Sequence, residues 1–216
     1  MLEKLQTISP YNALSAEELE SFSCHGTTRK FKKNKLIINQ GDETNSLYVL
    51  LEGELKVYTE DDNGKELTVR ILRAGDSFGE LALLGEFPRS ASVMTMTDCS
   101  AFVVTKANYM ECLRNNPQVS MALIKSLANM VKETTDELTH IALTDVYGRL
   151  VHMLEKYAIE KDGQPLVPKF THREMASMIG SSREMVSKIL KDLEKGEYIG
   201  VTGDHYVLQK KLPPRW

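Results

Sequence analysis

The stretch FGELALLGEFPRSASV, which begins at Phe78, combines residue types that could together hold an anionic ligand. Its candidate ligand-binding residues are Gly79, Glu80, Leu81, Arg89 and Ser90. The glycine lets the backbone approach a ligand closely, and the N–H groups at the start of the short helix that follows suit a phosphate. The arginine would neutralise that phosphate, and the serine can add a hydroxyl and a backbone N–H.

A glutamate beside an anion is unfavourable unless it accepts a hydrogen bond from the ligand, and a sugar hydroxyl would supply that donor. The set therefore indicates a ribose phosphate rather than a bare phosphate. The competing interpretation is a loop in which Glu80 and Arg89 simply pair with each other.

The segments around this stretch are short alternating runs rich in β-branched residues, from about Thr28 to Thr105. They include KLIINQ, SLYVLLEGELKVYT, ELTVRIL and SAFVVT, and glycine-containing turns separate them. Several short strands at close, regular spacing predict an antiparallel β-barrel or sandwich.

A long helical stretch without proline or glycine follows Pro117. Its apolar stripe has the spacing of a coiled-coil seam and consists of Leu127, Val131, Thr134, Leu138 and Ile141. We expect this helix to pair with a copy of itself; the alternative is a helix inside a bundle of the same chain. The break at Leu143–Asp145, where Asp145 can cap the next helix, is the candidate hinge.

The segment THREMASMIGSSREMVSKILKDLEKGEYI predicts a helix, a turn at Gly180 and a second helix. Thr171 and Glu174 have the spacing of a capping box, and Ser181 or Ser182 can cap the second helix. The following IGVTGDHYVLQ alternates around a Gly-Asp pair, as a small β-hairpin does.

The second helix should bury one apolar side, formed by Val186, Ile189, Leu190 and Leu193, and expose a charged one. Arginine can donate to O6 and N7 of guanine, a carboxylate can accept from N4 of cytosine, and lysine can serve guanine or phosphate. Such a helix in a major groove would read bases; the alternative is a solvated pair of helices. The candidate DNA-binding residues are Thr171, His172, Ser182, Arg183, Glu184, Ser187, Lys188 and Lys191.

Charge is distributed unevenly over the 216 residues, whose net charge is −3. Residues 1–145 hold 15 Lys and Arg against 21 Asp and Glu, while residues 146–216 hold 12 against 9. The C-terminal third is therefore the part suited to a polyanion. No apolar run approaches the ~20 residues of a membrane span, and the N-terminus lacks the order of a secretory signal, so we expect a cytoplasmic protein without membrane contact.

Three scattered cysteines, Cys24, Cys99 and Cys112, lack the paired spacing of a metal site or a disulfide framework. We expect buried thiols and no bound metal. No Ser-His-Asp, metal-ligand or nucleophile arrangement stands out, so we expect no enzymatic activity.

The stretch FGELALLGEFPRSASV resembles the phosphate-binding cassette of cyclic-nucleotide-binding domains. Nearly the whole chain is similar to bacterial transcription regulators of the cAMP receptor protein/FNR (Crp/Fnr) family. The resemblance implies an α+β fold: a β-roll of double-stranded jelly-roll type, a long dimerisation helix and a winged helix-turn-helix. The implied domains are 1–116 for the cyclic-nucleotide sensor, 117–144 for the dimerisation helix and hinge, and 145–216 for DNA binding.

The resemblance also implies roles for single residues. The cassette glycine and glutamate would hold the phosphate and the ribose 2′-hydroxyl, and the arginine and serine would hold the phosphate. Thr134 and Thr135 stand where cAMP-responsive members carry a Thr-Ser pair that meets the adenine from both subunits, and the Thr in place of Ser keeps both polar groups available. Two departures are the loop between Glu80 and Arg89, one residue shorter than in the enteric cAMP receptor, and Lys188, which replaces an arginine that contacts a second guanine. We expect a related but not identical half-site.

The implied function is a homodimeric regulator whose binding to pseudo-palindromic double-stranded DNA is gated by a cyclic nucleotide, first of all cAMP. One alternative is a member that binds DNA without cAMP or answers another effector such as cGMP or cyclic di-GMP. Another is a cyclic-nucleotide sensor that acts through a protein partner.

Further family properties concern partners and cofactors. RNA polymerase is an implied partner, through the acidic turn Glu60–Asp62 or the turn Asp162–Gly163, although the first could equally be a solvated hairpin tip. The chain has no N-terminal cysteine cluster, which argues against the iron–sulfur branch of the family. A haem-sensing relative would need a defined Cys and His in the sensor domain, and the adjacent Cys24 and His25 are weak support for such a pair.

Overall fold

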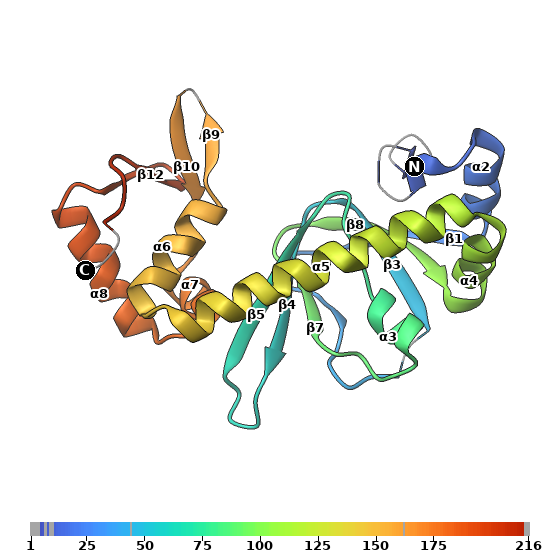
Figure 1. The fold of residues 1–216 in the computed structure, drawn as a ribbon, viewed down its shortest axis with the longest axis horizontal. Helices are drawn as coiled ribbons and strands as arrows, with labels where there is room; N and C mark the ends of the chain where they lie inside the picture. The colour runs from blue at the N-terminus through green and yellow to red at the C-terminus, as the bar shows by residue number, and fades with distance from the viewer. Residues whose placement is uncertain (1–4, 7, 9–10, 44, 162, 214–216) are drawn as a thin grey trace. The chain divides into compact units, whose positions relative to one another are not determined.

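The computed structural model describes residues 5–6, 8, 11–43, 45–161 and 163–213. By their internal contacts the residues form two compact units, 1–64 with 69–132 and 133–216 with 65–68. Figure 1 shows the elements of both units, coloured from blue at the N-terminus to red at the C-terminus. Asp162, which belongs to one turn predicted to contact RNA polymerase, lies outside the described residues.

The strands of the N-terminal region form two four-stranded sheets, which confirms the predicted antiparallel β domain. The first sheet has the order β1 (Gly26–Phe31), β8 (Cys99–Thr105), β3 (Ser46–Glu52), β6 (Ser77–Phe78). The second has the order β2 (Leu36–Ile38), β7 (Ser92–Thr95), β4 (Glu54–Glu60), β5 (Glu66–Arg73). The alternating apolar residues of these strands supply two hydrophobic clusters, around Phe102 and around Leu55.

Among the described residues, short helical elements accompany the sheets: η1 (Tyr11–Ala13), α2 (Ala16–Cys24), α3 (Glu80–Gly85) and α4 (Lys106–Asn115). The capping box of Ser15 and Glu18 starts α2, and the Thr105 hydroxyl, which accepts from the Asn108 N–H, starts α4. Neither α2 nor α4 is predicted from the sequence. Of the predicted buried thiols, Cys99 and Cys112 are buried and free.

Helix α5 (Pro117–Leu143) has the predicted position and contains 27 residues. Its N-terminal part packs on the first unit through the buried Val119 and the partly buried Leu123. Among the parts of the chain that the structure describes, no helix combines the length and the apolar character that a membrane span requires.

The second unit contains α6 (Val146–Lys156), α7 (His172–Ile179) and α8 (Arg183–Lys195), with a four-stranded sheet. The sheet has the order β11 (Ile199–Thr202), β12 (His205–Leu208), β10 (Gln164–Pro168), β9 (Ile159–Lys161). Asp145 caps α6 as predicted, because its carboxylate accepts from the Gly148 N–H at 2.8 Å. The β11–β12 hairpin turns at Gly203 and Asp204 as predicted. The strands β9 and β10, which pair with each other, are not predicted from the sequence.

Candidate ligand cavity and nucleic-acid interface

Gly79 lies between β6 and α3 in a left-handed backbone conformation, with φ 87° and ψ 0°. A side chain at this position would be strained by that backbone and would also meet neighbours, because an added Cβ would lie 2.6 Å from Arg89 Nη1. The glycine thus permits the sharp turn that directs Glu80, the first residue of α3, inward.

Arg89 is held from both its main chain and its side chain. Its N–H donates to the Asp42 carbonyl at 3.0 Å, and its own carbonyl accepts from the Gly41 N–H at 2.8 Å. The guanidinium donates to the carbonyl oxygens of Gly79 and Ser46, both at 2.6 Å. Arg89 is only 3% exposed, and burial lowers its pKa. The cassette therefore contains a buried cation whose position is set by four main-chain contacts.

Glu80 carries an unsatisfied acceptor. The residue is 6% exposed, and among the described residues its Oε2 atom has no hydrogen-bond partner. Burial raises the pKa of Glu80, an effect opposed by its own backbone N–H and by the charges of Arg70 and Arg89. A buried acceptor without a partner is costly, and a ligand hydroxyl would satisfy it.

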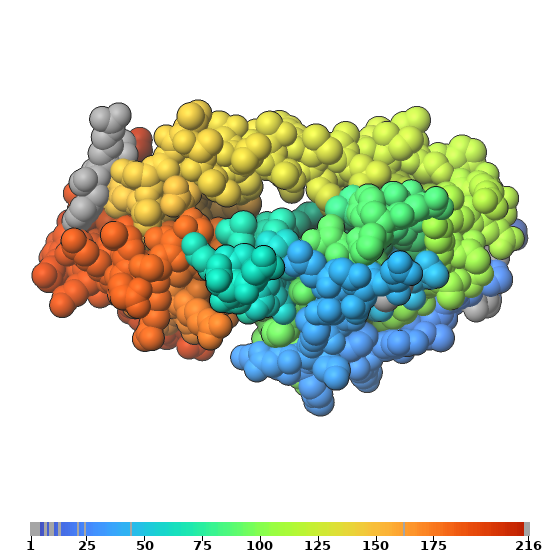
Figure 2. Space-filling view, turned by 90° about the horizontal axis from the view of Figure 1, so that it is seen from below, coloured from blue at the N-terminus to red at the C-terminus, as the bar shows by residue number. Residues whose placement is uncertain are grey.

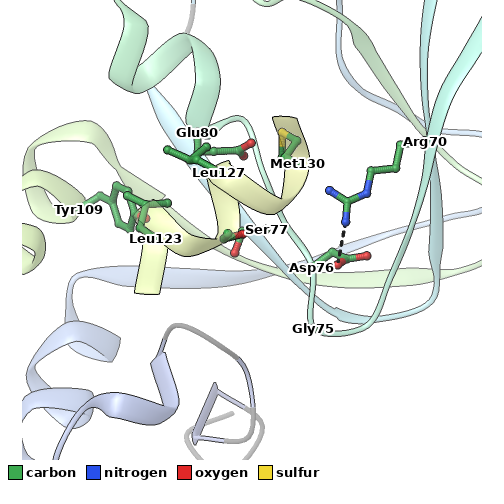
Figure 3. A pocket seen from close by; sticks show the side chains of 10 residues that line it. Arg70, Gly75, Asp76, Ser77, Glu80, Tyr109, Leu123, Leu127 and Met130 are labelled. Carbon is green, nitrogen blue, oxygen red and sulfur yellow. Dashed lines mark ion pairs between the residues drawn. The ribbon is translucent and has the colours of Figure 1, made fainter. Parts of the chain in front are cut away.

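A cavity of about 80 Å³ lies beside this carboxylate, within the first unit. Its lining residues are Arg70, Gly75, Asp76, Ser77, Glu80, Tyr109, Leu123, Ser126, Leu127 and Met130. Figure 3 shows the side chains of Glu80 and Arg70 reaching into it from α3 and β5, while α5 contributes the apolar wall. Figure 2 shows the α3 segment, in green, directly beside the N-terminal half of α5, in yellow-green.

The predicted ligand-binding residues fall into two groups. Gly79, Glu80 and Arg89 lie together, and Leu81 and Ser90 are exposed in the same segment. By contrast, the predicted adenine contacts Thr134 and Thr135 are exposed on α5, beyond Met130 and outside the cavity lining.

Other residues of the cavity are not predicted from the sequence. Arg70 and Tyr109 belong to no local motif and reach the cavity only through the packing of β5 and α4. Leu127, predicted for the coiled-coil seam, lines the cavity. Period-3.6 counting could have placed it with Leu123 and Met130 on one face of α5.

A second candidate site is the helix-turn-helix of α7 and α8. The predicted capping box is confirmed: the Thr171 hydroxyl accepts from the Glu174 N–H, and Glu174 Oε2 accepts from the Thr171 N–H at 2.6 Å. Gly180 ends α7 with φ 63°, and the Ser182 hydroxyl caps α8 by accepting from the Met185 N–H at 3.2 Å. These local signals fix both helix starts.

The apolar side of α8 is buried as predicted, with Val186, Ile189, Leu190 and Leu193 in the core. The opposite side exposes Arg183, Glu184, Lys188 and Lys191. Hydrogen bonds from its own backbone N–H and the Ser182 hydroxyl, together with the Arg183 charge, lower the pKa of Glu184. This face therefore presents an ionised carboxylate among cations.

Two further DNA-binding candidates contact each other. His172 Nδ1 lies 2.7 Å from the Ser187 hydroxyl, across the gap between α7 and α8. Both side chains are half-buried. The contact orients the imidazole ring relative to the exposed face of α8.

Comparison with protein families matches both regions of the chain. The cyclic nucleotide-binding domain matches residues 28–116, and the Crp-like helix-turn-helix domain matches residues 148–211. The first match contains Gly79, Glu80 and Arg89, and the second contains α7 and α8.

Whole proteins with the same organisation are also similar. The cAMP-activated global transcriptional regulator CRP of Haemophilus influenzae is 32% identical over 197 residues, which cover 88% of this chain and 87% of that protein. The regulator Vfr of Pseudomonas aeruginosa, also described as cAMP-activated, is 28% identical over 89% of this chain and 94% of its own length.

Solved structures share the fold. The c-di-GMP-responsive regulator CLP of Xanthomonas campestris matches with a TM-score of 0.80 at 23% identity, over 91% of this chain and all of that one. The catabolite activator protein of Thermus thermophilus matches with a TM-score of 0.56 at 27% identity, over 95% of this chain and 93% of that one.

Proposed function

This chain belongs to the Crp/Fnr family of DNA-binding transcription regulators with a cyclic nucleotide-binding domain, and we propose that it is a homodimer gated by a cyclic nucleotide. The first candidate effector is cAMP, because the curated relatives at 28–32% identity are cAMP-activated regulators. The proposed domains are 1–116 for the sensor, 117–144 for the dimer helix and hinge, and 145–216 for DNA binding.

The observation that carries this proposal is the unpartnered Glu80 Oε2 atom at the cavity. A ribose hydroxyl is the donor that would satisfy it, and the adjoining Gly79–Arg89 pair supplies the complementary anion-binding groups. The backbone N–H of Leu81 and the Ser90 hydroxyl would add donors to the phosphate. The residues present therefore fit a ribose phosphate, and binding of the nucleotide would supply the free energy that shifts the dimer between its states.

The proposed dimer interface is the exposed apolar stripe of α5. Ile124, Val131 and Leu138 recur every seven residues and are exposed, the last two by 66% and 64% of their surface. Such a heptad stripe on a long helix is typical of a coiled-coil partner surface. Thr134, between these positions, and the neighbouring Thr135 would meet the base of the nucleotide once two copies pair.

The exposed face of α8 is the proposed DNA-reading surface, with Arg183 and Lys188 for guanine and Glu184 for cytosine. A two-fold dimer would present two such helices to half-sites about one helical turn apart. The exposed acidic turn Glu60–Asp62 is the proposed contact for RNA polymerase.

Calorimetric titration with cAMP and cGMP tests the effector site. We expect binding by the wild-type protein and its loss in Glu80→Ala and Arg89→Leu. Glu86→Gln is the matched control, because Glu86 lies in the same segment but is exposed and pairs with Lys106 at 3.1 Å. Fluorescence anisotropy with a palindromic duplex should then show nucleotide-dependent DNA binding. Nucleotide affinity that survives in both cassette variants would contradict the proposed site.

A further inference from the structure

The effector cavity contains a cation besides the cassette arginine. Arg70 of β5 is the one basic residue among the described residues that line it, while Arg89 lies outside the lining. Figure 3 shows the Arg70 side chain directed into the cavity, on the far side of Met130 from Leu127. The cavity thus has an arginine that the phosphate-binding cassette does not account for.

Arg70 interacts electrostatically with Asp76 and with Glu80. Its Nη2 atom lies 3.8 Å from Asp76 Oδ1, which is longer than a hydrogen bond. Asp76 in turn is fixed by its Oδ2 atom, which accepts from the Arg73 N–H at 2.8 Å. The carboxylate therefore steers the guanidinium by charge and leaves it geometrically able to donate hydrogen bonds to a ligand.

The order of groups in a nucleotide determines which part of it Arg70 meets. Phosphate, ribose and base follow one another, and the Gly79–Arg89 pair and Glu80 would take the first two. The room beyond Glu80 is bounded by the apolar side chains of α5 and by Arg70. A flat base fits against the apolar wall, and its polar edge then faces the guanidinium.

We propose that Arg70 donates to the O6 and N7 edge of a purine and so favours a 6-oxo purine; this inference rests on the proposed function. Guanine presents two acceptors on that edge, which match the two parallel donors of a guanidinium. Adenine presents one acceptor and the N6 amino group, which is a donor and cannot accept from arginine. Arg70 therefore lowers the ability of the cavity to prefer cAMP over cGMP.

The test measures how Arg70→Met changes nucleotide selectivity. Calorimetric titration of the full-length protein with cAMP, cGMP and cyclic IMP gives three dissociation constants for each variant. We expect Arg70→Met to weaken the binding of cGMP and cyclic IMP by about 5- to 150-fold. The dissociation constant of cAMP should change by less than about 2-fold. Cyclic IMP should follow cGMP because it keeps O6 and N7 but lacks the 2-amino group.

Two controls make the measurement specific. Arg73→Met removes the same charge from the same strand outside the cavity lining, where Arg73 pairs with Glu54 at 3.5 Å, and should leave the selectivity ratio unchanged. The analogue 7-deaza-cGMP, titrated into the wild-type protein, removes the N7 acceptor without any substitution. It should bind more weakly than cGMP even if Arg70→Met does not fold.

The outcomes separate this inference from the proposed function. Equal weakening of all three nucleotides would show that Arg70 acts through its charge, and a loss confined to cAMP would show that Arg70 and Asp76 read adenine together. Either result overturns the inference and leaves the cyclic-nucleotide site in place. Failure of the wild-type protein to bind any of the three would overturn both.

Discussion

The guanidinium of Arg89 donates to the carbonyl oxygen of Gly79 at 2.6 Å, and a Cβ atom added to Gly79 would lie 2.6 Å from Arg89 Nη1. The two residues are ten positions apart in the sequence. Their contact holds the loop between them closed on itself, so the glycine is required both for its backbone conformation and for the space that the arginine fills.

Gly79→Ala should therefore destabilise the protein by about 1–3 kcal/mol and abolish nucleotide binding, because the alanine adds backbone strain and displaces the guanidinium. Chemical denaturation and calorimetry measure the two effects. Gly64→Ala is the matched control: Gly64 also has positive φ, 75°, but an added Cβ would meet nothing closer than 3.4 Å. Equal effects of the two substitutions would mean that the arginine contact contributes nothing.

Glu80→Gln should raise the stability of the nucleotide-free protein at neutral pH. Burial raises the pKa of Glu80 above its unfolded value of about 4.5, so its favourable contribution is full below that value and is lost as pH rises through the folded pKa. Glutamine avoids this loss. The advantage should vanish below pH 4.5, as measured by urea denaturation across pH 4 to 8.

Glu86→Gln controls for the removal of one negative charge from the same segment, and should give no comparable gain because Glu86 is exposed. Glu80→Gln should at the same time weaken nucleotide binding. A wild-type protein more stable than Glu80→Gln at pH 7 would contradict the assignment of an unsatisfied carboxylate.

The double substitution Val131→Glu with Leu138→Glu should convert the proposed dimer to monomers. Each substitution removes a large apolar side chain from the proposed seam. Together they should cost about 3 kcal/mol or more of dimerisation free energy, which weakens the dimer at least about 100-fold. Sedimentation velocity gives the oligomeric state. Asn129→Glu adds a single negative charge at an exposed position on another face of α5, and should leave the proposed dimer intact. A dimer that persists in the double variant would place the interface elsewhere.

Arg183→Ala should cost about 1–3 kcal/mol at one guanine of the half-site and relax the preference there. Lys191→Ala should instead weaken binding uniformly and reduce the salt slope by about 1, as loss of a phosphate contact does. Anisotropy titrations on single-base variants of the site, at several salt concentrations, distinguish these patterns. Uniform weakening by Arg183→Ala would reassign this residue to phosphate contact.

Local signals explain which elements can be predicted from the sequence. The capping box of Thr171 and Glu174, the cap at Asp145 and the positive-φ turn at Gly180 each depend on a few neighbouring residues. Helices α2 and α4 also have side-chain caps. Helix α4 begins directly after β8, so its sequence is not separated from the strand-rich region by a turn. The predicted seam shares Val131 and Leu138 with the exposed stripe but includes Leu127, which periodicity alone assigns ambiguously.

The segment from Phe78 to Val93, the strand-rich region, the long helix and the helix-turn-helix can all be predicted from the sequence, because periodicity, caps and glycine turns act over short distances. The surroundings of Glu80, by contrast, depend on how distant elements pack together. Arg70, Tyr109 and Met130 come from three different elements and meet at one cavity through packing of residues far apart in the chain. Whether a buried carboxylate keeps an unpaired oxygen depends on all the groups around it, which no local pattern in the chain specifies.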